Sequence, residues 1–374
     1  MSPRRFAAVI AVPLALACVA GSCGGRKAAV REAAAISSST AVGRTHGPNG
    51  ERATPASALR LTPAEVARVR AGRYDAALVW HDDSDFTAAV TAGVRDAFRP
   101  LAIRVVAQTS AGFDPATQKA DIETVTARRP DVMLTLPVDP VITASAYQQA
   151  ARQGTRIVLL SNVPQGMRQG RDYVDVVTDD LYDMGKRAAD ALAAAVGDEG
   201  EAGYVFRDAD SFVANQRDRA FLESLAASYP RVRIAVKLGI ADPNAAADQA
   251  GAALVTHPDL AALYVTFSQP IGDGVLAALR AAGNTTTKIV SLDLDEPLAL
   301  DMAKGGQTFA LIADRAYELG RAMATSAAYG LLGKPAPPFV VVPALTITRA
   351  NLVAGYRESL HRAPPASVLQ ALGR

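Results

Sequence analysis

From residue 74 onward, short runs of apolar residues alternate with stretches in which apolar residues recur about once in each helical turn. The runs are unbroken, which is typical of parallel strands that are buried on both faces. They predict ten strands, at residues 76–80, 103–107, 132–136, 157–160, 174–177, 203–206, 232–236, 262–265, 289–292 and 309–313. The stretches between them predict helices at residues 85–98, 118–128, 141–153, 184–196, 212–227, 245–256, 273–282 and 317–332. This alternation predicts an α/β protein with parallel sheets, and ten strands suggest two sheets rather than one.

Hydrogen-bonding side chains follow most of these strands directly. Ser161 and Asn162 come after the fourth run, Asp293 after the ninth and Asp314 after the tenth. Ligands of open α/β sheets bind at the carboxyl ends of the strands, so this recurrence predicts a polar binding site at those ends. Each of these residues alone could equally well cap a helix or form a turn. Trp80, the only tryptophan, ends the first run, where it could stack on a ligand or fill the core.

The composition narrows the class of protein. The chain of 374 residues has 39 Lys and Arg against 37 Asp and Glu, and 49% of its residues are hydrophobic, as in globular proteins. Because Arg4 and Arg5 are the only charged residues among the first 22, the rest of the chain is nearly neutral, which argues against nucleic-acid binding. No strand is followed by a nucleotide-binding glycine loop or a nucleophile elbow, so we expect neither an enzyme nor a cofactor. His81 has no second histidine nearby, so we expect no metal site.

The N-terminal residues predict export. Residues 1–22 combine a basic start with a short apolar run, which is typical of a signal peptide rather than of a membrane-spanning helix. Small residues precede Cys23, as in the lipobox of bacterial lipoproteins, so we expect lipidation at Cys23, with Cys18 as the alternative site. A plain secretory signal with incidental cysteines is the other interpretation. A lipidated chain would be a cell-envelope lipoprotein, held by its acyl chains in the periplasm or on the outer face of the cell membrane. Residues 23–60, rich in small and polar residues, predict a flexible tether.

Several motifs in the body of the chain resemble those of a known family. Residues 215–221, Asn-Gln-Arg-Asp-Arg-Ala-Phe, resemble an Arg-containing segment before an aromatic residue. Residues 289–293, Ile-Val-Ser-Leu-Asp, resemble an apolar strand that ends in a ligand-binding Asp. In their order and spacing, these motifs resemble the periplasmic ribose-binding-like sugar-binding proteins, which are the solute receptors of ABC importers and have the type I periplasmic binding fold. The resemblance covers about residues 73–352.

The resemblance implies two Rossmann-like lobes with parallel sheets, joined by a hinge of crossing segments. The N-terminal lobe would comprise residues 73–178 and 315–338, and the C-terminal lobe residues 179–314 and 339–355. Residues 356–374 would form a C-terminal tail. A sugar or sugar-like ligand would bind between the lobes and be buried by hinge closure, and an ABC permease in the membrane would recognise the closed form. A ligand-sensing receptor of the same fold, which feeds a signalling partner, is the alternative.

The resemblance also implies the residues of the binding site. A sugar needs carboxylates that accept hydrogen bonds, a guanidinium that donates them, and hydroxyls or amides that do both. The family's ligand contacts fall on Ser84, Phe86, Ser161, Asn162, Arg217, Ser268, Asp293 and Asp314, and Trp80 joins them as a candidate for stacking. Ser161 and Asn162 stand where ribose-type receptors often have Asp-Arg. A pentose, a hexose, a polyol and a non-sugar such as a nucleoside therefore stay open as ligands.

Overall fold

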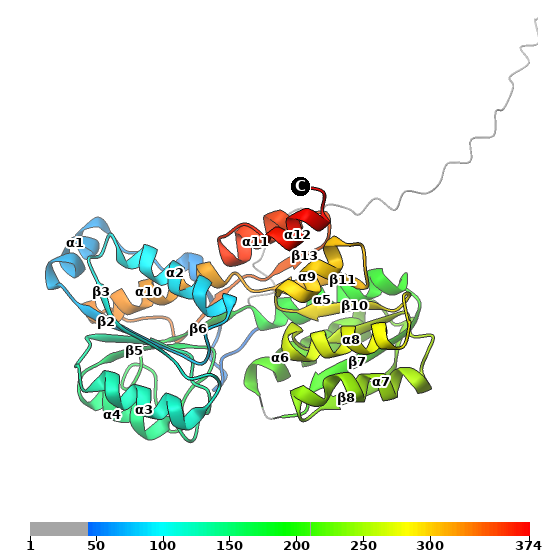
Figure 1. The fold of residues 1–374 in the computed structure, drawn as a ribbon. Coiled ribbons are helices and arrows are strands. Elements are labelled where there is room, and N and C mark those ends of the chain that lie inside the picture. Colours follow the sequence, from blue (N-terminus) through cyan, green and yellow to red (C-terminus); the bar gives the residue numbers. More distant parts are fainter. Residues whose placement is uncertain (1–43, 210) are drawn as a thin grey trace, which may run out of the picture. The chain divides into compact units, whose positions relative to one another are not determined.

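Two parallel-dominated β-sheets organise the chain in a computed structural model that describes residues 44–209 and 211–374 (Figure 1). The first sheet has the strand order β1-β12-β6-β5-β4-β2-β3, and all of its neighbouring strands are parallel. Its strands are β1 (Thr54–Pro55), β2 (Asp75–Trp80), β3 (Arg104–Ser110), β4 (Val132–Thr135), β5 (Arg156–Leu160), β6 (Val176–Asp179) and β12 (Phe339–Val342).

The second sheet has the strand order β13-β11-β10-β9-β7-β8, in which only the edge strand β13 runs antiparallel to its neighbour. Its strands are β7 (Gly200–Arg207), β8 (Val232–Ile240), β9 (Ala262–Val265), β10 (Lys288–Leu292), β11 (Thr308–Ala313) and β13 (Leu345–Ile347). The ten apolar runs of the sequence form β2 to β11. The predicted α/β fold with two parallel sheets is confirmed.

Helices cover both faces of the first sheet (Figure 1). One face carries α1 (Pro63–Gly72), α2 (Asp85–Phe98) and α10 (Ala316–Leu332), and the other carries α3 (Pro115–Thr126) and α4 (Ala144–Arg152). Alternate residues of β2 enter the two cores: Leu78 packs in the core on the side of α2 and α10, and Val79 in the core on the side of α3 and α4. The strand is therefore apolar on both faces, which explains its unbroken apolar run.

The second sheet is covered in the same way. α5 (Leu181–Val196) and α6 (Phe212–Ser228) pack on one face, and α7 (Ala246–Thr256), α8 (Asp273–Ala281) and α9 (Glu296–Ala303) pack on the other. Under α5 and α6, the rings of Phe221 and Tyr264 stack with 3.9 Å between their centroids, and Tyr204 stacks beside both.

Among the described residues, three segments cross between the two sheets. β6 leads into α5, β11 leads into α10, and β12 leads into β13. The last crossing corrects one predicted boundary, which placed residues 339–355 together in the C-terminal lobe. Residues 339–342 pair in parallel with β6 and so belong to the first sheet. Their sequence, Phe-Val-Val-Val, would suit a buried position in either sheet, so only the pairing decides between them.

Residues 44–55, which we call the N-terminal strap, are packed against the body of the protein, although the sequence predicted a flexible tether as far as residue 60. β1 pairs with β12 at the edge of the first sheet. The hydroxyl of Thr45 is buried, donates to the Asp180 carboxylate and accepts from the backbone N–H of Tyr182, at the start of α5. The strap thus contacts elements of both sheets, and polar composition alone did not reveal these long-range contacts.

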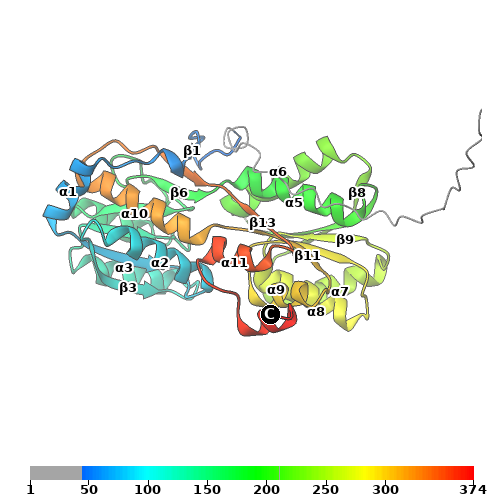
Figure 2. The same ribbon diagram turned by 90° about the horizontal axis from the view of Figure 1, so that it is seen from above.

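The predicted C-terminal tail, residues 356–374, is largely helical. α11 (Leu352–Leu360) contacts α2 and α10, and α12 (Ala366–Ala371) packs on α9 (Figure 2). Between them, Arg362 forms an ion pair with Asp85 at the start of α2. The C-terminal residues therefore pack against helices that cover the first sheet and against a helix that covers the second.

The predicted signal peptide, Cys18, Cys23 and the first part of the tether lie outside the described residues. Within residues 44–209 and 211–374, no helix has both the length and the apolar character needed to cross a membrane.

Candidate functional site

Arg217 and Asp293 meet at the strand ends of the second sheet. Arg217 lies in the first half of α6, and Asp293 directly follows β10. The Arg217 Nη1 donates to Asp293 Oδ1 at 2.9 Å, and its Nη2 donates to the carbonyl of Thr266 at 3.4 Å. Only 7% of Arg217 is exposed, so its charge depends on these partners rather than on water. The structure thus brings together two of the residues that the sequence analysis selected as candidate ligand contacts.

Asp314 joins this group together with Asp179, which the sequence analysis did not select. Asp179 ends β6 and Asp314 follows β11, so each stands where the chain crosses between the sheets. Their carboxyl groups lie within hydrogen-bonding reach of each other, an arrangement that needs a proton on one of them. Burial raises the pKa of Asp179 to about 7 and raises that of Asp314 well above its usual range.

The guanidinium of Arg217 balances only part of this negative charge. Burial by itself would lower the pKa of Arg217, but the nearby carboxylates of Asp293 and Asp314 outweigh burial and raise it. Three atoms of the group have no hydrogen-bond partner in the described part of the chain: Arg217 Nε, Asp179 Oδ1 and Asp314 Oδ1. We call Arg217, Asp179, Asp293 and Asp314 the crossing cluster. It offers a free donor beside free acceptors, which is the combination that a hydroxyl-bearing ligand can use.

Ser161 contacts β6, the strand that carries Asp179, in the first sheet. Its Oγ lies 2.9 Å from the Oγ1 of Thr178, which directly precedes Asp179, and its backbone N–H donates to the carbonyl of Val177. The amide of Asn162 points elsewhere and donates to the carbonyl of Pro137 at 2.9 Å.

Ser161 and Asp293 also share an uncommon backbone conformation. Their φ angles are 62° and 68°, in the left-handed region that side chains other than glycine rarely adopt. Such strained residues cluster at ligand sites, where the surrounding structure holds them in place. Six other non-glycine residues of the described chain share this conformation, among them the helix caps Arg73 and His361, so the backbone alone does not single out these two candidates.

Ser268 belongs to a second acidic group. Ser268 is buried within hydrogen-bonding reach of Asp295, which accepts from the backbone N–H of Leu298 as the cap of α9. Asp273 faces Asp295 as well, and burial together with this neighbouring carboxylate raises the pKa of Asp295 to about 7. The structure thus places Ser268 with Asp295 rather than with Arg217.

The three candidates near the end of β2 have structural partners of their own. The Trp80 side chain is 1% exposed, and its Nε1 donates to the hydroxyl of Thr91, so it occupies the core position that the sequence left open as the alternative. Ser84 caps α2, and Phe86 is half-buried against the core. In the described ranges, no hydrogen bond or ion pair connects these three residues to the crossing cluster.

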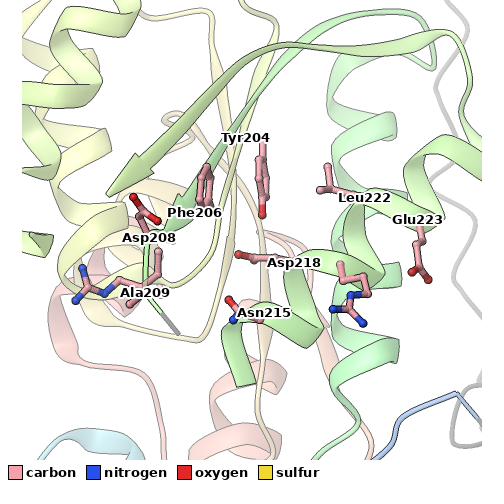
Figure 3. Close-up of a pocket in the computed structure, with 10 residues that line it drawn as sticks. Tyr204, Phe206, Asp208, Ala209, Asn215, Asp218, Leu222 and Glu223 are labelled. Carbon is pink, nitrogen blue, oxygen red and sulfur yellow. The ribbon is translucent and has the colours of Figure 1, made fainter. Parts of the chain in front are cut away.

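A cavity of about 420 Å³ lies beside α6 (Figure 3). Figure 3 shows the rings of Tyr204 and Phe206 next to each other on β7, with Asn215 and Asp218 of α6 opposite them. None of the predicted site residues lines this cavity. Asp218, the neighbour of Arg217, accepts hydrogen bonds from the hydroxyls of Tyr264 and Thr266.

The chain has two β-sheets covered by helices and connected by three crossing segments. Charged residues gather where the strands end at these crossings. These features define the class of two-lobed α/β binding proteins. Within this class, the chain belongs to the periplasmic binding protein domain family, whose sequence model matches residues 61–335. The predicted family resemblance is therefore confirmed. The search of curated proteins gives no match to this chain.

Solved structures of solute-binding and sugar-binding proteins share the fold. An ABC transporter solute-binding protein from Agrobacterium vitis, bound with α-D-tagatopyranose, superposes with a TM-score of 0.67 and 24% identity, over 76% of this chain and 98% of the other. An arabinose-binding protein from Geobacillus stearothermophilus gives a TM-score of 0.67 at 20% identity, over 75% and 98% of the two chains. A solute-binding protein from Actinobacillus succinogenes with bound D-allose gives a TM-score of 0.65 at 17% identity, over 75% of this chain and 99% of the other.

Proposed function

We propose that this chain is the extracytoplasmic solute-binding lipoprotein of an ABC importer and that it binds a sugar or sugar-like molecule between its two lobes. The observation that carries the proposal is the crossing cluster: a buried guanidinium with one free donor, surrounded by carboxylates with free acceptors. Sugar hydroxyls donate and accept at once, so they can use both kinds of atom. Family membership and the sugars in the related structures support the same conclusion.

In this proposal, hinge closure tells the permease that a ligand is bound. The three crossings allow the lobes to move as two bodies, and the cluster residues Asp179 and Asp314 stand at two of them. A ligand that contacts both lobes binds the closed state more tightly than the open one, so it shifts the population toward closure. The permease then recognises the closed form. Acylation at Cys23 keeps the protein at the membrane surface.

A thermal-shift screen against pentoses, hexoses, polyols, amino sugars and nucleosides tests the proposal. A ligand at a hundredfold excess over its Kd adds about 2.7 kcal/mol to the free energy of unfolding, which raises Tm by several degrees. Any compound that gives this shift is then recovered from the protein and identified, and we expect it to be chemically unchanged. A complete absence of shifts across the panel contradicts the proposal, and conversion of the ligand to a product points to an enzyme instead.

Two variants, one on α6 and one directly after β10, test whether the cluster binds the ligand. Asp293→Asn keeps the size of the side chain, and Arg217→Lys keeps its charge but not its planar fork. Each should lower the affinity measured by calorimetry by at least about tenfold, because a hydrogen bond to a buried charged group is lost. Arg219→Lys is the matched control, since Arg219 is exposed on the same helix two residues away. Unchanged affinity in both cluster variants would remove the cluster from the binding site.

A further inference from the structure

The crossing cluster carries more negative than positive charge. Three carboxylates, Asp179, Asp293 and Asp314, surround the single guanidinium of Arg217. Among residues 44–209 and 211–374, Arg217 is the only basic side chain that forms an ion pair with any of the three. Arg315, which directly follows Asp314 in the chain, pairs instead with Glu358 on α11.

A shared proton does not remove this imbalance. Even if Asp179 and Asp314 hold one proton between them, the cluster keeps one net negative charge. The neighbouring Asp218 is also buried, and its hydrogen bonds come from neutral hydroxyls. Neither Ser161 nor Thr178 on the first-sheet side brings a positive charge. Buried charge that is not paired is costly, so closure around a neutral ligand would bury this charge without compensation.

The cluster atoms that have no hydrogen-bond partner indicate which kind of ligand group would neutralise the net negative charge. Asp179 is 6% exposed, and its Oδ1 has no donor in the described part of the chain; Asp314 Oδ1 also has none. These acceptors come from two different crossings, so one group with several N–H donors could serve both. Arg217 Nε remains as a donor for an acceptor of the same ligand, such as a hydroxyl or ring oxygen.

We propose that the ligand carries a protonated amine, so that the site takes an amino sugar or another amine-bearing polyol in preference to its neutral counterpart. The ammonium binds between Asp179 and Asp314, and a hydroxyl or ring oxygen of the ligand accepts from Arg217. The positive charge of the ligand offsets the one net negative charge that the cluster keeps when these two carboxyl groups share a proton. This inference rests on the proposed function and specifies the substrate class of the same site.

Matched pairs of compounds test the inference by calorimetry at neutral pH. The pairs are D-glucosamine with D-glucose and D-galactosamine with D-galactose, and N-acetyl-D-glucosamine serves as a bulky analogue without the charge. We expect each amine to bind at least about tenfold more tightly than its neutral partner, as for a charge-assisted hydrogen bond to a buried group. The N-acetyl compound should lose this advantage.

Variants show whether the carboxylates cause the preference. Asp314→Asn should reduce the ratio of amine to neutral affinity by about tenfold or more, with a smaller effect on the neutral sugar. Asp83→Asn, on the exposed loop after β2, is the control that should leave the ratio unchanged. Equal or tighter binding of the neutral sugars, or a ratio that survives Asp314→Asn, overturns the inference but leaves a sugar-binding function in place. Binding of no compound in either class overturns the proposed function and the inference together.

Discussion

The ion pair between Arg217 and Asp293 can be tested without any ligand, by a double-mutant cycle on the free energy of unfolding. The variants are Arg217→Met, Asp293→Asn and the double substitution. The two side chains are 8% and 30% exposed and meet at 2.9 Å, so the pair is partly shielded from water. Removing the guanidinium leaves Asp293 and Asp314 without their cation, and breaking a buried pair in this way costs about 3–5 kcal/mol.

Asp293→Asn should cost less, because Arg217 still faces Asp179 and Asp314. We therefore expect a coupling free energy of about 2 kcal/mol between the two positions, within the usual range for residues in one charged network. Urea unfolding followed by circular dichroism measures all four proteins. The control cycle is the exposed pair Lys186–Asp190 on α5, for which we expect about 0.3–0.5 kcal/mol. A coupling at Arg217 and Asp293 no larger than in the control would show that water screens the pair and that the cluster is not buried.

Three further predictions concern the scaffold. Gly320→Ala should lower the free energy of unfolding by about 3 kcal/mol or more in urea titrations, because its Cβ would lie 2.0 Å from the Val90 carbonyl oxygen. Asp175 is fully buried, and desolvation raises its pKa from 3.8 to about 7, so its contribution to stability is lost as the pH rises between these values. Asp175→Asn should therefore gain stability relative to wild type across that range, by up to about 1.4 kcal/mol per pH unit in urea titrations at several pH values, and a constant difference would contradict this. Thr45→Val should weaken the contact of the N-terminal strap with Asp180 by about 1–2 kcal/mol, seen as faster hydrogen exchange in residues 44–55; unchanged exchange would contradict this.

The hydrophobic pattern predicted most of the strands because each is buried on both faces. β2 illustrates this, since every residue from Ala76 to Trp80 is buried. The pattern could not assign residues 339–342 to a sheet, nor detect the pairing of β1 with β12, because both depend on contacts between residues far apart in the chain.

The candidate site was predicted in part. Asp293 and Asp314 come together because strand ends converge at the crossings, which the position of polar residues after apolar runs can indicate. Arg217 lies on α6 and was predicted only from the family resemblance. Asp179 was missed because two acidic residues follow one another at the end of β6, and the sequence does not show which one faces the crossing. The structure separates them, since Asp180 caps α5 and contacts Thr45, whereas Asp179 faces Asp314.

The closure that we propose for the two lobes on a sugar-like ligand can be measured directly as a distance between spin labels. Cys18 and Cys23 are the only cysteines of the chain, so replacing both with serine allows labels to be placed at will. Asp83→Cys, on the loop after β2, and Ala241→Cys, on the loop after β8, are exposed positions on the two lobes. With the compound that gives the largest thermal shift at saturation, pulsed electron paramagnetic resonance should show this distance becoming shorter and more narrowly distributed. A distance that stays the same in the presence of bound ligand would contradict the hinged, two-lobed mechanism.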